Sequence, residues 1–240
     1  MKVIINAGHS STDPGFMGPT GTYEYDVVAA FCRVLEQTLR ERQIAVQIIW
    51  QPGGNTQWAL NHLVQKINEH DDADYLLSIH CAKSEDREAY GTRVIYLPDS
   101  EDGKLLAERI CKHFPRTLWS GTEAREDYIL RQARCTAVLV EMDFISNPEV
   151  ELLLQTQAWR KKAAQKLVEG IFEDMESSQD IRLFIDDKEI YADPAPQEVY
   201  NDVMVPVRLV AHALGGRVEW DRVHRIVRIH TFRPPSSGLS

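Results

Sequence analysis

The feature that most constrains the fold is an alternation of short apolar runs with longer helical patterns across residues 2–171. The apolar runs have the length of buried strands and cover residues 2–6, 45–50, 75–80, 92–97 and 137–141. Apolar side chains recur at helical spacing in residues 27–39, 105–113 and 159–171. Because parallel strands are joined by helical crossovers, this pattern predicts an α/β domain with a mostly parallel sheet flanked by helices on both faces.

The composition changes after residue 171. Residues 173–180 are polar and lack apolar anchors, which is typical of a linker. The following segment is rich in short strands and has one helical stretch at 207–214, ended by two glycines. We therefore expect a first domain at residues 1–176, a linker at 177–180 and a small α+β accessory domain at 181–240.

The charge distribution bears on the partners. The chain has 27 Lys+Arg and 36 Asp+Glu, a formal net charge of −9, which argues against nucleic acid as a partner. The acidic excess lies before residue 181, because 8 basic and 8 acidic residues follow that point. No apolar run approaches the roughly 20 residues that span a bilayer. The first apolar segment stops at Asn6, so the start does not have the basic region and roughly 7–15-residue apolar stretch of a signal peptide. We expect no membrane insertion and a protein made in the cytoplasm.

Polar side chains stand where three of the predicted strands end. His9 follows the first strand, His80 ends the third and Glu141 ends the fifth, while Glu24 opens the first helix. Ligands bind at the carboxyl ends of parallel strands, so we expect these four side chains at one edge of the sheet. Two imidazoles and a carboxylate are a donor set of catalytic zinc sites, which keep one position open for water. The pattern predicts His9, Glu24 and His80 as Zn²⁺ ligands and Glu141 as the general base.

Each residue also has a structural interpretation. A histidine at a strand end is often a hydrogen-bonded structural residue, and a glutamate in the first turn of a helix often interacts with the helix dipole. Glu141 is harder to explain in this way, since a carboxylate at the end of a buried strand needs a partner or a function. The joint placement of the four residues favours the metal site.

Several motifs resemble one enzyme family. They are NAGHSSTDPG at 6–15, YEYDV at 23–27, SIH at 78–80, YILR at 128–131 and AVLVEMDFISNP at 137–148. In this order they are similar to the zinc N-acetylmuramoyl-L-alanine amidases of the amidase 3 type, from the first strand to about residue 171. The resemblance implies that His9, Glu24 and His80 bind zinc and that Glu141 is the catalytic glutamate. It implies hydrolysis of the amide between N-acetylmuramic acid and the L-alanine of the peptidoglycan stem peptide.

The chain departs from the family pattern at four places. The family usually has Asp-Pro before the first Gly-His and Gly-Gly after it, where this chain has Asn6-Ala7 and Ser10-Ser11. Cys81-Ala82 replaces a usual Ala-Asn, residues 50–54 replace a segment with an arginine, and Asp143 replaces a common glycine. None of these is one of the four chemical positions. We expect Cys81 to pack as a small apolar side chain.

The C-terminal segment resembles a second module. Its motifs are IRLFIDDKEI at 181–190, VMVPVRLV at 203–210 and ALGGRVEWD at 213–221. They are similar to the copper amine oxidase N-terminal-like stalk domain of bacterial wall-associated proteins, a resemblance that does not imply copper. The basic stretch at 217–233 favours attachment to acidic wall polymers, which would raise the concentration of a tethered catalyst on the wall. A role in stabilising or dimerising the enzyme is the alternative.

The resulting expectation is a peptidoglycan hydrolase whose partner is the cell-wall polymer. An extracellular substrate without a leader segment fits a phage endolysin that acts after release, or an autolysin secreted with a leader that this sequence does not include. Two alternatives stay open: a zinc peptidase that cuts the stem peptide, and a non-catalytic, metal-dependent wall-binding protein. Glu141 counts against the second alternative, because binding alone needs no general base.

Overall fold

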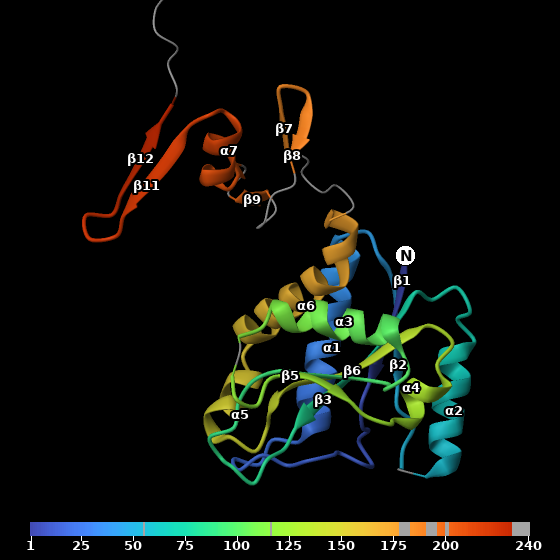
Figure 1. Cartoon of the computed structure of the whole chain (residues 1–240). Helices are drawn as coiled ribbons and strands as arrows, with labels where there is room; N and C mark the ends of the chain where they lie inside the picture. The colour runs from blue at the N-terminus through green and yellow to red at the C-terminus, as the bar shows by residue number, and fades with distance from the viewer. Residues whose placement is uncertain (55, 116, 178–182, 191–195, 200–201, 232–240) are drawn as a thin grey trace, which may run out of the picture. The chain divides into compact units, whose positions relative to one another are not determined.

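The computed structural model describes residues 1–231 except 55, 116, 178–182, 191–195 and 200–201. The chain divides into two compact units, Met1–Glu173 and Asp174–Ser240. Figure 1 shows both units with most of their helices and strands labelled. Among the described residues, no helix combines the length and apolarity that crossing a bilayer requires.

The first unit is built on a six-stranded sheet with the strand order β2-β1-β3-β6-β4-β5. The strands are β1 (Lys2–Ala7), β2 (Ala45–Trp50), β3 (Tyr75–Ala82), β4 (Arg93–Tyr96), β5 (Gly121–Ala124) and β6 (Thr136–Phe144). β1, β2, β3 and β6 are parallel, whereas β4 is antiparallel to β6 and parallel to β5. The expected α/β class with a mostly parallel sheet is confirmed.

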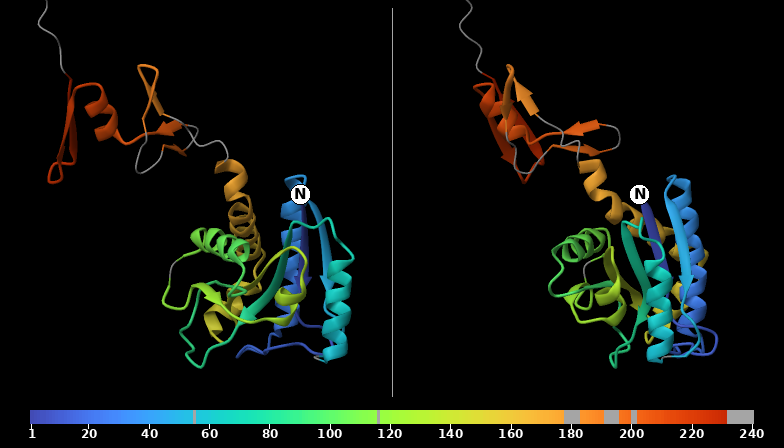
Figure 2. Two further views of the ribbon diagram at one scale, coloured as in Figure 1. Left: turned by 45° about the vertical axis from the view of Figure 1, so that its right-hand side comes forward. Right: turned by 90° about the vertical axis from the view of Figure 1, so that its right-hand side faces the viewer.

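Helices cover both faces of this sheet (Figure 2). They are α1 (Glu24–Glu41), α2 (Gln57–Asn68), α3 (Glu101–Lys112), α4 (Tyr128–Gln132), α5 (Pro148–Leu154) and α6 (Gln157–Ser177). One apolar cluster joins alternate strand residues such as Val3 and Ile5 to α1, α3 and α6. A second joins the intervening residues, such as Ile4, to α2 and α4. Burial of both faces explains why the strands are almost continuously apolar.

Polar caps define where several helices begin. The side chains of Thr56, Ser100 and Asp127 accept hydrogen bonds from the first backbone amides of α2, α3 and α4. Asn147 caps α5 in the same way, with Pro148 at its first position. These caps place the helix starts within one residue of the polar side chains that the sequence offers.

The second unit consists of short pieces. Its strands form three antiparallel pairs: β7 (Leu183–Ile185) with β8 (Lys188–Ile190), β9 (Gln197–Val199) with β10 (Asp202–Met204), and β11 (Arg217–Asp221) with β12 (Ile226–His230). One helix, α7 (Val207–Ala213), precedes β11. Among the side chains described after residue 177, Ala211 alone is buried. The part of the expected linker at 178–180 lies outside the described residues, and the part before it belongs to α6.

Candidate metal centre

Three separate elements meet at the carboxyl edge of the parallel strands. His9 lies two residues after β1, Glu24 is the first residue of α1, and His80 lies in β3 close to its end. β1 and β3 are neighbours in the sheet, which brings the two histidines together across 71 residues of sequence. The structure thus brings together three of the four residues predicted to carry the chemistry.

The three side chains form a compact cluster around the Glu24 carboxylate. His9 Nε2 lies 3.2 Å from Glu24 Oε2, and His80 Nδ1 lies 3.2 Å from Glu24 Oε1. One donor atom from each residue lies within 4.8 Å of the other two, a separation that one metal ion can bridge. The two imidazole rings are nearly perpendicular, with centroids 5.1 Å apart. The Glu24 side chain is 1% exposed, so its charge is directed at the histidines and not at solvent.

The charge state of the cluster follows from this geometry. Burial raises the pKa of Glu24, but the hydrogen bonds with His80 and His9 outweigh burial and lower the pKa from 4.5 to about 2. Burial lowers the pKa of His9, but the hydrogen bond and charge of Glu24 outweigh burial and hold that pKa above 6.5. Backbone amides of Phe16 and Cys81 also donate to the Glu24 oxygens, at 3.1 and 2.9 Å. The site therefore keeps an ionised carboxylate between two imidazoles.

The loop that carries His9 depends on two glycines, which allow its close approach to His80 and Glu24, and on the side chain of Gln51. His9 has a left-handed backbone (φ 64°), and its N–H donates to Gln51 Oε1 at 3.1 Å. A Cβ on Gly8 would collide with the His80 ring, and a Cβ on Gly15 (φ 72°) would lie 2.6 Å from Glu24 Oε2. Gln51 belongs to the segment that departs from the family pattern, and here it supports the backbone of His9.

Glu141 lies beside this cluster in β6. Its register partner in β3 is His80, so the two side chains are neighbours on one face of the sheet. The Glu141 side chain is 11% exposed and contacts two arginines, Arg93 and Arg125. Neither arginine stood out in the sequence, because an isolated arginine in a short strand, like Arg93, or after one, like Arg125, carries no pattern.

Two further departures, Cys81 and Asp143, have structural explanations. The Cys81 side chain is buried in the apolar cluster beneath α1, as expected of a small apolar side chain, and burial raises the pKa of its thiol. Asp143 accepts hydrogen bonds from the backbone N–H groups of Gly91 and Phe144 at 2.7 and 2.9 Å. Its partial burial raises the pKa of Asp143, and its hydrogen bond with Gly91 anchors the loop before β4.

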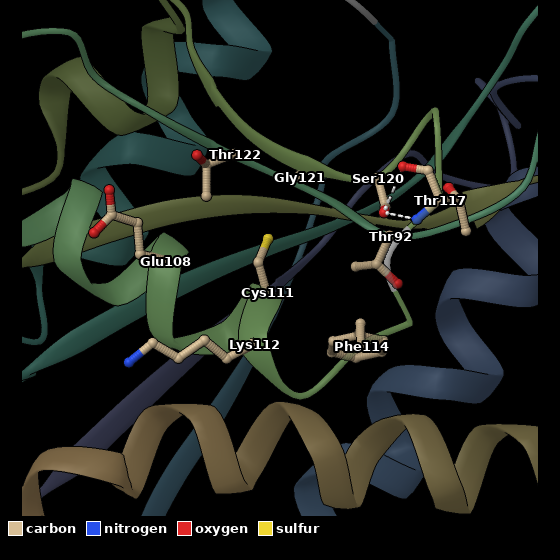
Figure 3. Close-up of a pocket in the computed structure, with 9 residues that line it drawn as sticks. All are labelled: Thr92, Glu108, Cys111, Lys112, Phe114, Thr117, Ser120, Gly121 and Thr122. Carbon is tan, nitrogen blue, oxygen red and sulfur yellow. Dashed lines mark hydrogen bonds between the residues drawn. The ribbon is translucent and has the colours of Figure 1, made fainter. Parts of the chain in front are cut away.

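A separate cavity of about 470 Å³ lies between α3, β5 and the side chains of Phe114, Thr117 and Ser120. Figure 3 shows Cys111 and Glu108 of α3 on one side of it and Gly121 and Thr122 of β5 on another. Burial raises the pKa of the Cys111 thiol to about 11, so the thiol is protonated near neutral pH. None of the four predicted chemical residues lines this cavity, and the chemistry is concentrated at the edge of the parallel strands.

An α/β sheet that carries two imidazoles and a buried carboxylate at one edge, with a second carboxylate alongside, has the arrangement of a metallohydrolase. Residues 3–173 match the family model of N-acetylmuramoyl-L-alanine amidase, and residues 183–233 match that of the copper amine oxidase N-terminal domain. The chain therefore belongs to the N-acetylmuramoyl-L-alanine amidase family.

Individual relatives agree with this assignment. The chain is 26% identical over 186 residues to an uncharacterised cell wall amidase of Bacillus anthracis, covering 71% of this chain and 35% of that protein. It is 25% identical over 217 residues to the N-acetylmuramoyl-L-alanine amidase AmiA of Escherichia coli K12, covering 70% and 74%. The solved catalytic domain of the CD27L endolysin, which targets Clostridium difficile, superposes with a TM-score of 0.61 at 26% identity, covering 72% and 97%. The match thus spans about a third of one curated relative and about three quarters of the other.

Proposed function

We propose that this chain is a zinc-dependent N-acetylmuramoyl-L-alanine amidase, which hydrolyses the amide between N-acetylmuramic acid and the L-alanine of the stem peptide. The observation that carries the proposal is the His9–Glu24–His80 cluster beside Glu141, in a chain that matches the amidase family over residues 3–173. The substrate is peptidoglycan, and the scissile bond is an unactivated amide.

The residues of the cluster fit Zn²⁺. Neutral imidazole nitrogens and a carboxylate oxygen are ligands of catalytic zinc, and three protein ligands leave a position for water. Gly8 and Gly15 give the cluster its space, since a side chain at either glycine would enter it. When bound, zinc would lower the pKa of a coordinated water to about 7 and polarise the substrate carbonyl.

Glu141 supplies the proton transfers in this proposal. Its position next to His80 in the sheet register places a carboxylate beside the cluster without making it part of the ligand set. The carboxylate takes a proton from the attacking water and then gives it to the leaving nitrogen of L-alanine. Glu141 thus acts as a base in its ionised form when water attacks, and as an acid in its protonated form when the amine leaves.

The second unit and the place of action belong to the same proposal. Residues 217–233 carry five arginines against one glutamate and one aspartate, and this charge favours binding to acidic wall polymers. The similarity to an endolysin catalytic domain supports a role in wall lysis. We therefore propose that the chain acts as an endolysin or an autolysin.

Paired substitutions test the mechanism. Glu141→Gln should retain about one zinc per chain and lose turnover by about 100-fold or more, because it removes the base but not a ligand. Glu24→Gln should lose zinc, because the amide cannot supply the charge between the imidazoles. Glu36→Gln is the matched control, since Glu36 lies in the same helix and pairs with Arg40 on the surface. Metal analysis and release of the L-alanine amino group are the measurements.

The outcomes separate the two roles. Wild-type turnover in Glu141→Gln would contradict the assignment of the base. Full zinc occupancy in Glu24→Gln would contradict the ligand set.

A further inference from the structure

The carboxylate of Glu141 is held on both oxygens by guanidinium groups. Arg93 Nε donates to Glu141 Oε2 at 2.7 Å, and Arg93 Nη2 contacts the same oxygen. Arg125 Nη2 donates to Glu141 Oε1 at 3.4 Å. Two N–H groups therefore occupy one oxygen, and one longer contact reaches the other.

The sheet topology produces this arrangement. β4 runs antiparallel to β6 with Arg93 directly opposite Glu141, so the two side chains share a face of the sheet. β5 extends the sheet beyond β4, and the chain after it returns Arg125, whose backbone N–H donates to the carbonyl of Tyr96 at 2.9 Å. β6 lies between β3 and β4 in the sheet, so His80 and Arg93 stand on opposite sides of Glu141.

Arg93 is itself held in place. Its guanidinium lies over the Phe144 ring at 5.2 Å from the centroid, and its Nη1 lies 3.8 Å from Glu123. The side chain is 30% exposed, so the ion pair with Glu141 is partly shielded from solvent. A guanidinium stacked on a ring and placed between two carboxylates has few other orientations available.

We propose that Arg93 is a positioning residue for Glu141, with Arg125 as a weaker second contact, and that together they leave Oε1 as the oxygen that accepts the proton. This role rests on the proposed function of Glu141 as the base. An ionised carboxylate has about four acceptor sites, two on each oxygen. Arg93 fills both sites on Oε2 and Arg125 fills one on Oε1, so the remaining site is on Oε1. Holding a reacting group at a defined orientation raises the rate without any change in substrate binding.

The first test separates kcat from KM. Arg93→Met should lower kcat by about 10- to 100-fold on a soluble muropeptide, with KM within about 3-fold of wild type, because misplacing a catalytic group slows the reaction step. Arg125→Met should have a smaller effect of the same kind. Arg131→Met is the matched control, because Arg131 is held by Glu126 and Asp99 in the same part of the chain and makes no contact with Glu141 that the structure records. Zinc content and thermal stability should match wild type in all three variants.

The second test restores the missing cation. Arg93→Ala leaves space for a small ion, so millimolar guanidinium chloride, far below denaturing concentrations, should recover part of kcat. Arg93→Lys should also keep part of the activity that Arg93→Ala loses, since the lysine ammonium restores the positive charge but not the paired N–H contacts of the guanidinium with Glu141. Glu141→Ala should show no recovery with guanidinium.

Each result has a defined consequence. Wild-type kcat in Arg93→Met overturns the positioning role. A loss of kcat in Arg93→Met that is accounted for by a matching loss of bound zinc or of thermal stability also overturns it. Absence of rescue by both guanidinium and lysine overturns it as well. If the wild-type chain releases no L-alanine amino groups, the proposed function itself is wrong. If the wild-type chain is active and the Arg93 variants have the same kcat, the proposed function stands and only the positioning role of Arg93 is wrong.

Discussion

At the scale of single residues, Glu24 organises the site. Its carboxylate meets His9 and His80 with one oxygen each and accepts two backbone N–H groups, one from the loop before α1 and one from β3. Removing its charge would leave two imidazoles without the anion that orients them. The site thus depends on a residue that, taken alone in the sequence, resembles an ordinary charge in the first turn of a helix.

Glu151 is another buried carboxylate, and it supports the loop that leads to Glu24. It is fully buried and accepts hydrogen bonds from the N–H groups of Thr20 and Thr22 at 2.7 and 2.9 Å. A Cβ on Gly18 would enter the space of this carboxylate. Burial raises the pKa of Glu151, but the bonds from Thr20 and Thr22 outweigh it and hold the pKa below 4.5.

Glu151→Gln should lower the free energy of unfolding by about 1–3 kcal/mol at pH 7. The amide keeps one acceptor oxygen, so one of the two backbone N–H groups would face the amide NH2 group, which cannot accept a hydrogen bond. Because the pKa is lowered on folding, the stabilisation is complete above about pH 4.5 and is lost as the pH falls further. The difference between wild type and variant should therefore shrink below about pH 4.5. Urea unfolding at several pH values measures it, and a difference that does not change with pH would contradict this assignment.

The residues that the sequence did and did not reveal differ in a physical way. His9, His80 and Glu141 could be found because each follows a recognisable apolar run, and the ends of parallel strands meet at one edge. Arg93, Arg125 and Glu151 could not, because their roles depend on which strands and loops become neighbours. Such pairings come from the tertiary fold and leave no periodic signal.

At the scale of elements, the longer segments were predictable and the short ones were not. β2 spans the predicted residues, and α1 and α6 extend the predicted helical stretches at both ends. α3 begins four residues before its predicted stretch and ends one residue before the predicted end. The strand β5 was missed because Gly121–Ala124 has no apolar run and pairs at the edge of the sheet. The direction of β4 was also not predictable, since an apolar run is the same in either orientation. Helices α4 and α5 and strands β9 and β10 had no strong periodicity of their own. Helix α2 was missed although its buried side chains, Ala59, Leu63 and Ile67, recur at helical spacing.

Helices α3 and α6 pack with their backbones in close contact at Gly170. A Cβ there would lie 2.6 Å from the Cα of Ile110, and backbone cannot move aside as a flexible side chain can. Gly170→Ala should therefore destabilise the first unit by about 1–3 kcal/mol, although alanine is the better helix former. Denaturant unfolding with zinc analysis measures this. Unchanged or increased stability would show that the two helices can separate without loss.

At the scale of the whole molecule, the net charge of −9 belongs to the residues before 181, and the later segment is neutral with a basic end. The described side chains of the second unit form no apolar core comparable to that of the first. This division favours a catalytic unit that carries the chemistry and an appended unit that contacts the wall. The proposed domains at 1–176 and 181–240 follow from it.

A chain that ends at residue 177 tests this division. It should keep the turnover of the full chain on soluble muropeptides, because the site lies entirely within the first unit. It should lose retention on purified insoluble walls at low salt, where attraction between charges is least screened. Retention equal to that of the full chain would contradict wall binding by the second unit and favour a stabilising or dimerising role.

The central claim is zinc-dependent cleavage of one defined amide, and mass spectrometry of digested cell walls tests it most directly. Walls are treated with the zinc-loaded chain, with the chain after chelation, and with the chelated chain after zinc is restored. We expect stem peptides with a free L-alanine amino group in the first and third digests and intact linkages in the second. Products cut within the peptide or the glycan, or cleavage that continues unchanged after chelation, would contradict it.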